Sequence, residues 1–314
     1  MSLSRRGFLA GSAGVLAGAV AGRPALARAW QQQPAPITPV FTPIRRNVGF
    51  FTGRGGTIGY LINATGVVVV DSQYPDSAKL CLDGLQERSR NRGVDLLINT
   101  HHHADHTGGN IVFKGLAKAI VANARAAELQ QQVYDAAVKA AAEKGGAAPA
   151  EILVADRTFT TTWSQELGDE KITARTYTPA HTGGDAIVFF EKANVVHMGD
   201  LMFNRVHPVI DRPAGASIAN WIKMVAAVAN DHDADTIYIF GHTKVGFPAT
   251  GSRADLAVMG DYLTALLVYV RAQVAAGKPR DVVIASTDVL RGFEDHGPLL
   301  ARALTAAYDE VTAK

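Results

Sequence analysis

One short loop of this chain holds much of its chemically useful side-chain content. The segment NTHHHADHTGGN, residues 99–110, contains four of the ten histidines of the chain with an aspartate among them. Neutral imidazoles and carboxylate oxygens are good ligands for zinc. In a turn that directly follows a strand, His101 and His103 can converge on one ion, while Asp105 and His106 face a neighbouring position. The loop therefore predicts part of a metal centre.

Three further side chains share one setting, the end of an apolar strand, and a loop alone cannot complete two metal sites. They are His181 in TPAHTGGD, Asp200 in VVHMGD and His242 in YIFGHT. We expect them to supply the remaining ligands. The spacing makes His102 the odd one out, so a non-ligand role is expected for it. Four histidines lack such a setting, and surface or structural roles are expected for them: His197, His207, His232 and His296.

The segments around the histidine loop alternate between strand and helix patterns. Helical spacing predicts a helix at residues 77–90. Strands are predicted at residues 47–53, 57–63, 66–72 and 94–100. Strand, helix, strand and polar loop form a βαβ arrangement, whose ligand sites lie beyond the carboxyl ends of the strands. Asp71, at the end of its strand, either orients the loop or an imidazole, or is a turn residue only.

The later half of the chain continues this alternation. Strands are predicted at residues 171–178, 185–191, 194–200 and 235–241. Helices are predicted at residues 124–144, 217–229 and 253–275, and from residue 299 onward. Two strand-rich halves, each with its own helices, predict two sheets packed together with helices outside.

The motifs taken together resemble the metallo-β-lactamase superfamily. H-x-H-x-D-H after a strand, His before Thr-Gly-Gly-Asp, then Gly-Asp and Gly-His, extend the resemblance over residues 45–245. It implies a metallo-β-lactamase fold, an α+β fold arranged as a four-layer αββα sandwich, with two zinc ions at one edge. It also implies that the first metal is held by His101, His103 and His181. The second metal would be held by Asp105, His106 and His242, and Asp200 would bridge the two.

Such a centre implies hydrolysis. A zinc-bound water has its pKa lowered to about 7, and two metals about 3.5–4 Å apart can hold the resulting hydroxide and polarise a carbonyl. Histidines and carboxylates leave coordination positions open, as a catalytic site requires. Asp105 is the side chain expected to be catalytic in addition to binding metal. We expect a metal-bound hydroxide to cleave a carbonyl substrate.

The substrate is less constrained by the sequence. β-Lactam hydrolysis is a prominent function of exported members of this superfamily, and it is the leading named expectation. The aspartate at position 200, where classical zinc β-lactamases have a cysteine or no bridge, resembles instead the glyoxalase II, lactonase and phosphodiesterase branches. Hydrolysis of another ester, lactone or thioester is therefore the alternative. An iron-binding redox or accessory protein of the same fold is a further alternative.

The first 29 residues are expected to be an export signal. Arg5 and Arg6 precede Gly-Phe-Leu and an uncharged apolar run, and Ala-Leu-Ala at residues 25–27 fits a cleavage site. The arginine pair resembles a twin-arginine signal, which is read by the twin-arginine export machinery. The run is too short for a permanent anchor. The mature protein is therefore expected in a bacterial periplasm, without a stable membrane anchor after cleavage.

Composition limits the partners and the domain count. A net charge of +2 and the lack of a dense Lys/Arg block argue against nucleic acid and favour a small-molecule substrate. The single cysteine, Cys81, excludes an intramolecular disulfide, and its apolar pattern predicts a buried helix position. We expect an extended lead-in at residues 30–45 and one hydrolase domain at residues 46–314.

Overall fold

The computed structural model describes residues 36–313 of the chain. The expected signal at residues 1–29 and the first part of the lead-in lie outside this range. The helices and strands that follow belong to one compact unit, Ile37–Lys314. None of the helices described is at once long enough and apolar enough to cross a bilayer.

The first sheet has seven strands whose spatial order is their chain order. They are β1 (Val40–Arg45), β2 (Val48–Thr52), β3 (Ile58–Ile62), β4 (Val67–Val70), β5 (Leu96–Asn99), β6 (Ile120–Asn123) and β7 (Arg157–Phe159). Strands β1 to β4 pair antiparallel, and β4 to β7 pair parallel. Helix α1 (Pro75–Ser89) connects β4 to β5. The predicted βαβ unit is therefore present, and the histidine loop follows the carboxyl end of β5.

The second sheet has six strands. Their order is β15 (Thr250–Gly251), β13 (Ile237–Ile239), β11 (Val195–His197), β10 (Ala186–Phe190), β9 (Glu170–Thr176) and β8 (Thr162–Leu167). A short parallel pair, β12 (Phe203–Asn204) and β14 (His242–Thr243), includes the predicted ligand His242. The remaining helices are α2 (Ala104–Thr107), α3 (Ala124–Glu143), α4 (Ile218–Asp231), α5 (Arg253–Ala275), α6 (Arg280–Ile284) and α7 (Ala301–Thr312).

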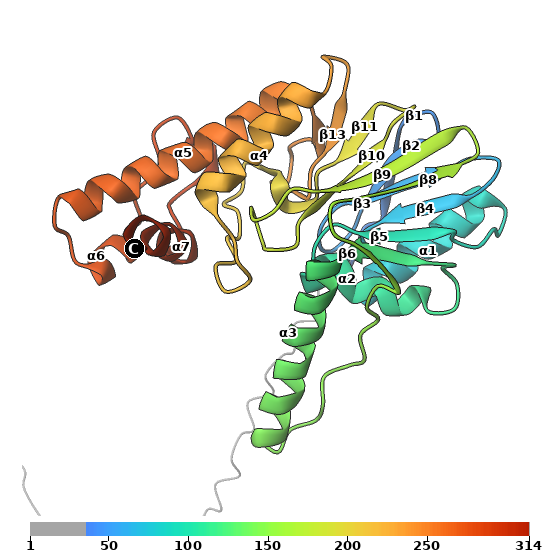
Figure 1. Cartoon of the computed structure of the whole chain (residues 1–314), viewed down its shortest axis with the longest axis horizontal. Coiled ribbons are helices and arrows are strands. Elements are labelled where there is room, and N and C mark those ends of the chain that lie inside the picture. Colours follow the sequence, from blue (N-terminus) through green and yellow to red (C-terminus); the bar gives the residue numbers. More distant parts are fainter. Residues whose placement is uncertain (1–35, 314) are drawn as a thin grey trace, which may run out of the picture. The chain divides into compact units, whose positions relative to one another are not determined.

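Side-chain alternation along the strands divides the core into layers. Val68 and Val70 of β4 pack with side chains of the second sheet such as Val188, while Val67 and Val69 pack outward against α1. The outer face of the second sheet packs against α4 and α5, and α7 packs against α5 and α6. Helices thus cover both outer faces of two packed sheets (Figure 1). The αββα sandwich expected from the sequence is confirmed.

Some elements differ from the sequence expectation. Strand β1 falls within the predicted lead-in, where it pairs with β2 at the edge of the first sheet. Helix α3 extends away from the sheets (Figure 1), and its buried residues, Ala126, Leu129 and Gln130, all lie in its first half.

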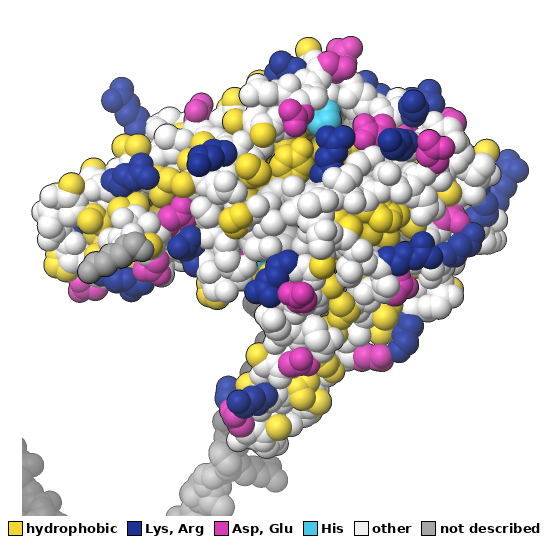
Figure 2. All heavy atoms as spheres, viewed as in Figure 1, with side chains coloured by type: hydrophobic (Ala, Val, Ile, Leu, Met, Phe, Trp, Pro, Cys, Tyr) yellow, Lys and Arg dark blue, Asp and Glu magenta, His cyan; other side chains and the backbone are white. Residues whose placement is uncertain are grey.

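Cys81 is buried in α1, as predicted. On the face shown in Figure 2, basic and acidic side chains are interspersed.

Candidate metal centre

Asp71 anchors the histidine loop to the end of β4. Its Oδ1 accepts a hydrogen bond from the backbone N–H of Thr100 at 2.8 Å, and its Oδ2 accepts from the Thr100 hydroxyl at 2.8 Å. The same Oδ2 accepts from Nδ1 of His106 at 2.7 Å, with both side chains fully buried. Of the two interpretations of Asp71, the structure therefore supports the one in which it orients the loop and an imidazole.

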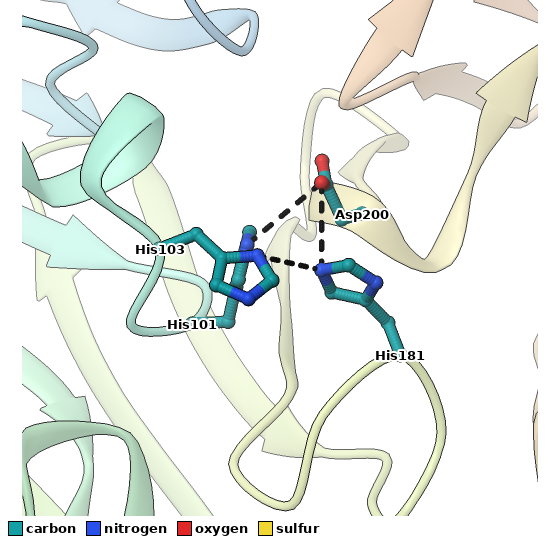
Figure 3. A group of neighbouring side chains, drawn as sticks. All are labelled: His101, His103, His181 and Asp200. Atoms are coloured by element: carbon teal, nitrogen blue, oxygen red, sulfur yellow. Dashed lines mark hydrogen bonds and ion pairs between the residues drawn. The ribbon is translucent and has the colours of Figure 1, made fainter. Parts of the chain in front are cut away.

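The first group of potential ligands is His101, His103, His181 and Asp200 (Figure 3). One ligand atom from each lies within 4.8 Å of the ligand atoms of all the others. Nδ1 of His103 lies 3.0 Å from Nε2 of His181, which is 3.5 Å from Oδ2 of Asp200. Nε2 of His101 is 3.8 Å from the same oxygen. The structure thus brings together the side chains predicted to form the first-metal set.

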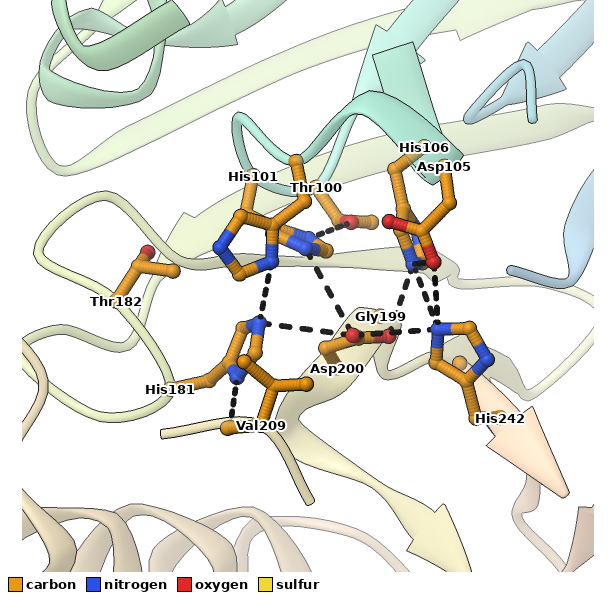
Figure 4. Close-up of polar contacts among 12 residues, drawn as sticks. Thr100, His101, Asp105, His106, His181, Thr182, Gly199, Asp200, Val209 and His242 are labelled. Atoms are coloured by element: carbon orange, nitrogen blue, oxygen red, sulfur yellow. Dashed lines mark hydrogen bonds and ion pairs between the residues drawn. The ribbon is translucent and has the colours of Figure 1, made fainter. Parts of the chain in front are cut away.

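The second group is Asp105, His106 and His242 (Figure 4). Nε2 of His242 lies 3.0 Å from Oδ2 of Asp105 and 3.3 Å from Nε2 of His106. Asp200 lies between the two groups. Its Oδ1 is 3.0 Å from Nε2 of His106, and its Oδ2 is 3.4 Å from Nε2 of His242. This is the placement that a bridging carboxylate requires.

Both sheets contribute to these groups. The histidine loop follows β5 of the first sheet, whereas His181, Asp200 and His242 follow β9, β11 and β13 of the second. Gly199 turns the chain at the end of β11 with a φ of 51°, a backbone conformation that L side chains rarely adopt. This turn directs Asp200 into the space between the groups (Figure 4).

Hydrogen bonds on the outer side of three of the imidazoles decide which of their nitrogens points inward. Nδ1 of His181 donates to the carbonyl of Val209 at 2.8 Å, so Nε2 points inward. In His106 the bond from Nδ1 to Asp71 has the same effect. The ring of His103 is reversed, because its Nε2 donates to Oδ2 of Asp211 at 2.9 Å and leaves Nδ1 inward. Such outer bonds fix the tautomer of metal-binding histidines.

Burial favours the neutral form of His101 and His181, whereas neighbouring carboxylates favour the protonated form of His106 and His242. Burial lowers the pKa of His181 to about 3, and it holds the pKa of His101 well below its usual value. Burial also acts on His242, but Asp200 and Asp105 outweigh it and raise the pKa of His242 to about 9. Asp200 and Asp71 likewise raise the pKa of His106 against burial. Carboxylates therefore make this place favourable for cations.

The donor set fits divalent metal ions. Among the residues that the structure describes, none gives the buried Nε2 of His101 a hydrogen bond, although that atom faces the first group. A buried polar atom without a partner is costly unless a ligand satisfies it. Imidazole nitrogens and carboxylate oxygens are the ligand types that zinc takes. The second-group residues Asp105 and His242 are about one quarter exposed, so the centre is accessible from their side.

The four histidines expected to have surface or structural roles, which are His197, His207, His232 and His296, belong to neither group. His197 is buried between the sheets, where its Nε2 donates to the carbonyl of Thr57 at 3.0 Å, and His207 contacts the hydroxyl of Tyr262 through Nδ1 at 2.6 Å. His232 stacks on Phe189.

Two residues of the site were not predicted from the sequence. Asp211 lies beside both His102 and His103, and hydrogen bonds from these histidines hold its pKa well below its usual range. Gly56 lies against the ring of His106, where a Cβ atom would come within 2.1 Å of Cε1.

The comparisons with known proteins agree with this geometry. The model of the metallo-β-lactamase superfamily matches residues 52–263, which include both groups of ligands. A curated relative, the 2,4-dinitroanisole O-demethylase subunit alpha of Nocardioides sp. (strain JS1661), is 30% identical over 145 residues. That alignment covers 44% of this chain and 39% of the relative, so this chain matches less than half of the relative's length.

Solved structures share the fold at low sequence identity. A metallo-β-lactamase from Pontibacter korlensis has a TM-score of 0.56 at 17% identity, covering 72% of this chain and 99% of its own. The metallo-β-lactamase IND-7 has a TM-score of 0.55 at 19% sequence identity. The match covers 74% of this chain and 100% of IND-7. A double mutant of the sec-alkyl sulfatase PisA1 has a TM-score of 0.62 at 16% sequence identity. The match covers 86% of this chain and 50% of the sulfatase chain. With the family match extending over two thirds of its residues, this chain belongs to the metallo-β-lactamase superfamily.

Proposed function

We propose that this protein is a dinuclear zinc hydrolase that cleaves a small-molecule carbonyl substrate. The observation on which the proposal rests is the position of Asp200, whose two oxygens face the inward nitrogens of both ligand groups. Two bound zinc ions would supply an activated water at neutral pH and Lewis-acid polarisation of the carbonyl. His101, His103 and His181 would hold one ion, Asp105, His106 and His242 the other, with Asp200 shared.

On the open side of the metal centre, residues of the chain would bind and orient the substrate. Asp105 and His242 are partly exposed, whereas Asp200 is 3% exposed. A substrate would therefore approach past Asp105, which we propose as the side chain that accepts or holds a proton during cleavage. A pocket of about 460 Å³ adjoins His242, between the glycine-rich turn of residues 53–57 and the loop of residues 243–249. This is the size range of pockets for small molecules.

A β-lactam is the first substrate to test. The proposal is supported by the expected export of the chain and by the likeness of its fold to two metallo-β-lactamases. Another ester, lactone or thioester is the alternative, because Asp200 stands where classical zinc β-lactamases lack an aspartate. The partial relative is named as a subunit of a 2,4-dinitroanisole O-demethylase, which adds an activated aryl ether as a third candidate.

A substrate panel tests the proposed hydrolysis directly. We expect zinc-loaded protein to cleave a carbonyl member of a set comprising a β-lactam, a lactone, a thioester, a phosphodiester and an aryl ether. Cleavage of the phosphodiester or the aryl ether alone would contradict the proposed carbonyl substrate. Chelation should abolish the activity and added Zn²⁺ should restore it. His103→Ala should lower the rate at least about 100-fold, since even partners of metal ligands contribute 10–100-fold. His232→Ala, which alters a histidine outside both groups, is the control.

Two other outcomes of this experiment would contradict the proposal. Activity that survives chelation would exclude a metal-dependent reaction. Protein purified with iron and inactive on the whole panel would favour the redox or accessory alternative. Metal analysis of the purified protein is therefore part of the same experiment.

We also propose export to the periplasm through the twin-arginine route. A reporter fused to residues 1–29 should reach the periplasm, and replacing Arg5 and Arg6 by lysine should stop its transport, because this route reads the arginine pair. Fractionation of cells that express both fusions measures the effect. Unchanged transport of the lysine variant would instead favour the general secretory route.

A further inference from the structure

We infer that Asp211 is a positioning residue for the first metal site, acting on His103 through its carboxylate and on His181 through its backbone. The inference rests on the proposed metal centre. Asp211 lies in the segment between β12 and α4, and its side chain is 21% exposed. It belongs to neither of the two ligand groups around Asp200, although with His102 and His103 it forms a third cluster of potential ligand atoms, which shares His103 with the first group.

The carboxylate sets the orientation of His103. Its Oδ2 accepts the hydrogen bond from Nε2 of His103 at 2.9 Å, and the opposite ring nitrogen, Nδ1, then lies 3.0 Å from the inward nitrogen of His181. His181 and His106 point Nε2 inward instead. His103 is therefore a ring whose inward nitrogen depends on an acceptor placed at its outer end. Without Asp211, the ring loses the partner that selects its tautomer and its rotation.

The backbone of the same residue restrains the loop of His181. The N–H of Asp211 donates to the carbonyl of His181 at 3.2 Å. Oδ1 of Asp211 accepts from the N–H of Ala214 at 3.1 Å, and the carbonyl of Ala214 accepts from the N–H of Gly183 at 2.8 Å. These bonds join residues 211–214 to residues 181–183. One residue thus connects two of the three histidines of the first group.

This arrangement gives the middle histidine of the loop a role. His102 is buried, and its Nε2 lies 3.5 Å from the Oδ2 of Asp211 that His103 also contacts. The imidazoles of two consecutive residues therefore approach one carboxylate oxygen. His102 helps to hold the carboxylate against His103, consistent with the non-ligand role expected from its spacing.

Zinc titration of variants tests the inference without any substrate. Apo-protein would be titrated with Zn²⁺ in competition with a chromophoric chelator. Asp211→Ala should weaken one of the two binding steps about 10–100-fold, as loss of a metal-ligand partner does in other proteins. Asp211→Asn keeps an oxygen that can accept from Nε2, so it should lose less. In Co²⁺-substituted protein, the absorption bands of the first site should shift in Asp211→Ala.

Asp95→Ala is the matched control. Its carboxylate is also mostly buried and accepts a backbone N–H, that of Val67 at 2.8 Å, but it precedes β5, at the end of that strand away from the histidine loop. It should bind zinc like the wild type. Equal zinc affinity in wild type and Asp211→Ala, or a lower melting temperature without a change in affinity, would overturn the inference.

Two further outcomes keep the test decisive. If Asp211→Ala does not fold, Asp211→Leu, which has no acceptor atom on a side chain of similar size, takes its place, and unchanged zinc affinity in that variant would overturn the inference. A wild-type protein that binds no zinc would refute the proposed function, whereas a wild type that binds two ions beside an unaffected variant refutes only the role of Asp211.

Discussion

Asp200→Ala should lose the second metal first and reduce hydrolysis at least about tenfold. Its Oδ1 lies 3.0 Å from His106 and its Oδ2 lies 3.4 Å from His242, so the substitution removes an anionic ligand shared with the second group. A carboxylate can give one oxygen to each ion and offset their mutual repulsion, while a methyl group cannot. The first group keeps its three histidines and should retain its ion.

Metal content and rate measure this effect together. We expect Asp200→Ala to stay folded and to bind close to one zinc per chain. Asp200→Asn keeps the shape of the side chain but not its charge, so it should also weaken the second site and thereby separate loss of charge from loss of packing. Two zinc ions held at wild-type affinity with full activity in both variants would show that Asp200 is a turn residue and not a bridge.

Gly56→Ala should lower activity about 100-fold through the position of His106. A Cβ at residue 56 would come within 2.1 Å of the His106 ring, which is buried and held from behind by Asp71 at 2.7 Å. The backbone N–H of Gly56 donates to the carbonyl of Asp105 at 3.0 Å, so the two segments cannot separate freely. A displacement of about 1 Å at a reacting group can cost 10²-fold in rate. Overpacking should also destabilise the fold by about 1–3 kcal/mol.

The matched control is another glycine with room around it. Gly260 lies inside α5, and no atom lies within 4 Å of the Cβ that alanine would add. Gly260→Ala should keep wild-type activity and gain up to about 1 kcal/mol in unfolding free energy. Rate, zinc content and melting temperature would be compared among the three proteins. Wild-type zinc content and rate in Gly56→Ala would mean that His106 can move without loss.

The ligand groups and the αββα fold follow from local patterns that sequence analysis can read. Apolar strands end in His, Asp or Gly-Asp motifs, and strand ends of this fold meet at one edge. The short interior strand β6 was not predicted, and neither were edge strands such as β1 and β8. Strand β8 has a polar, alternately exposed pattern, and β1 contains Pro43 and is partly exposed, so neither has the continuous apolar run of a central strand.

Asp211 could not be predicted for a different reason. It lies in a segment without periodicity, and its partner His103 is 108 positions away in the chain. Its neighbours in sequence resemble an ordinary loop, so only the folded backbone brings the carboxylate to the imidazole. Gly56 is a similar case, because one glycine in a glycine-rich turn does not indicate that a histidine ring packs against it.

The origin of the ligands in both sheets has a consequence for stability. Ions held by the loop after β5 together with His181, Asp200 and His242 would act as cross-links between the two halves of the sandwich. A ligand that binds only the folded state adds RT ln(1 + [L]/Kd) to the unfolding free energy, about 4.1 kcal/mol at 1,000 times Kd. The fraction of folded protein would then depend on the free metal concentration. At low metal concentration, both the folded fraction and the activity would fall.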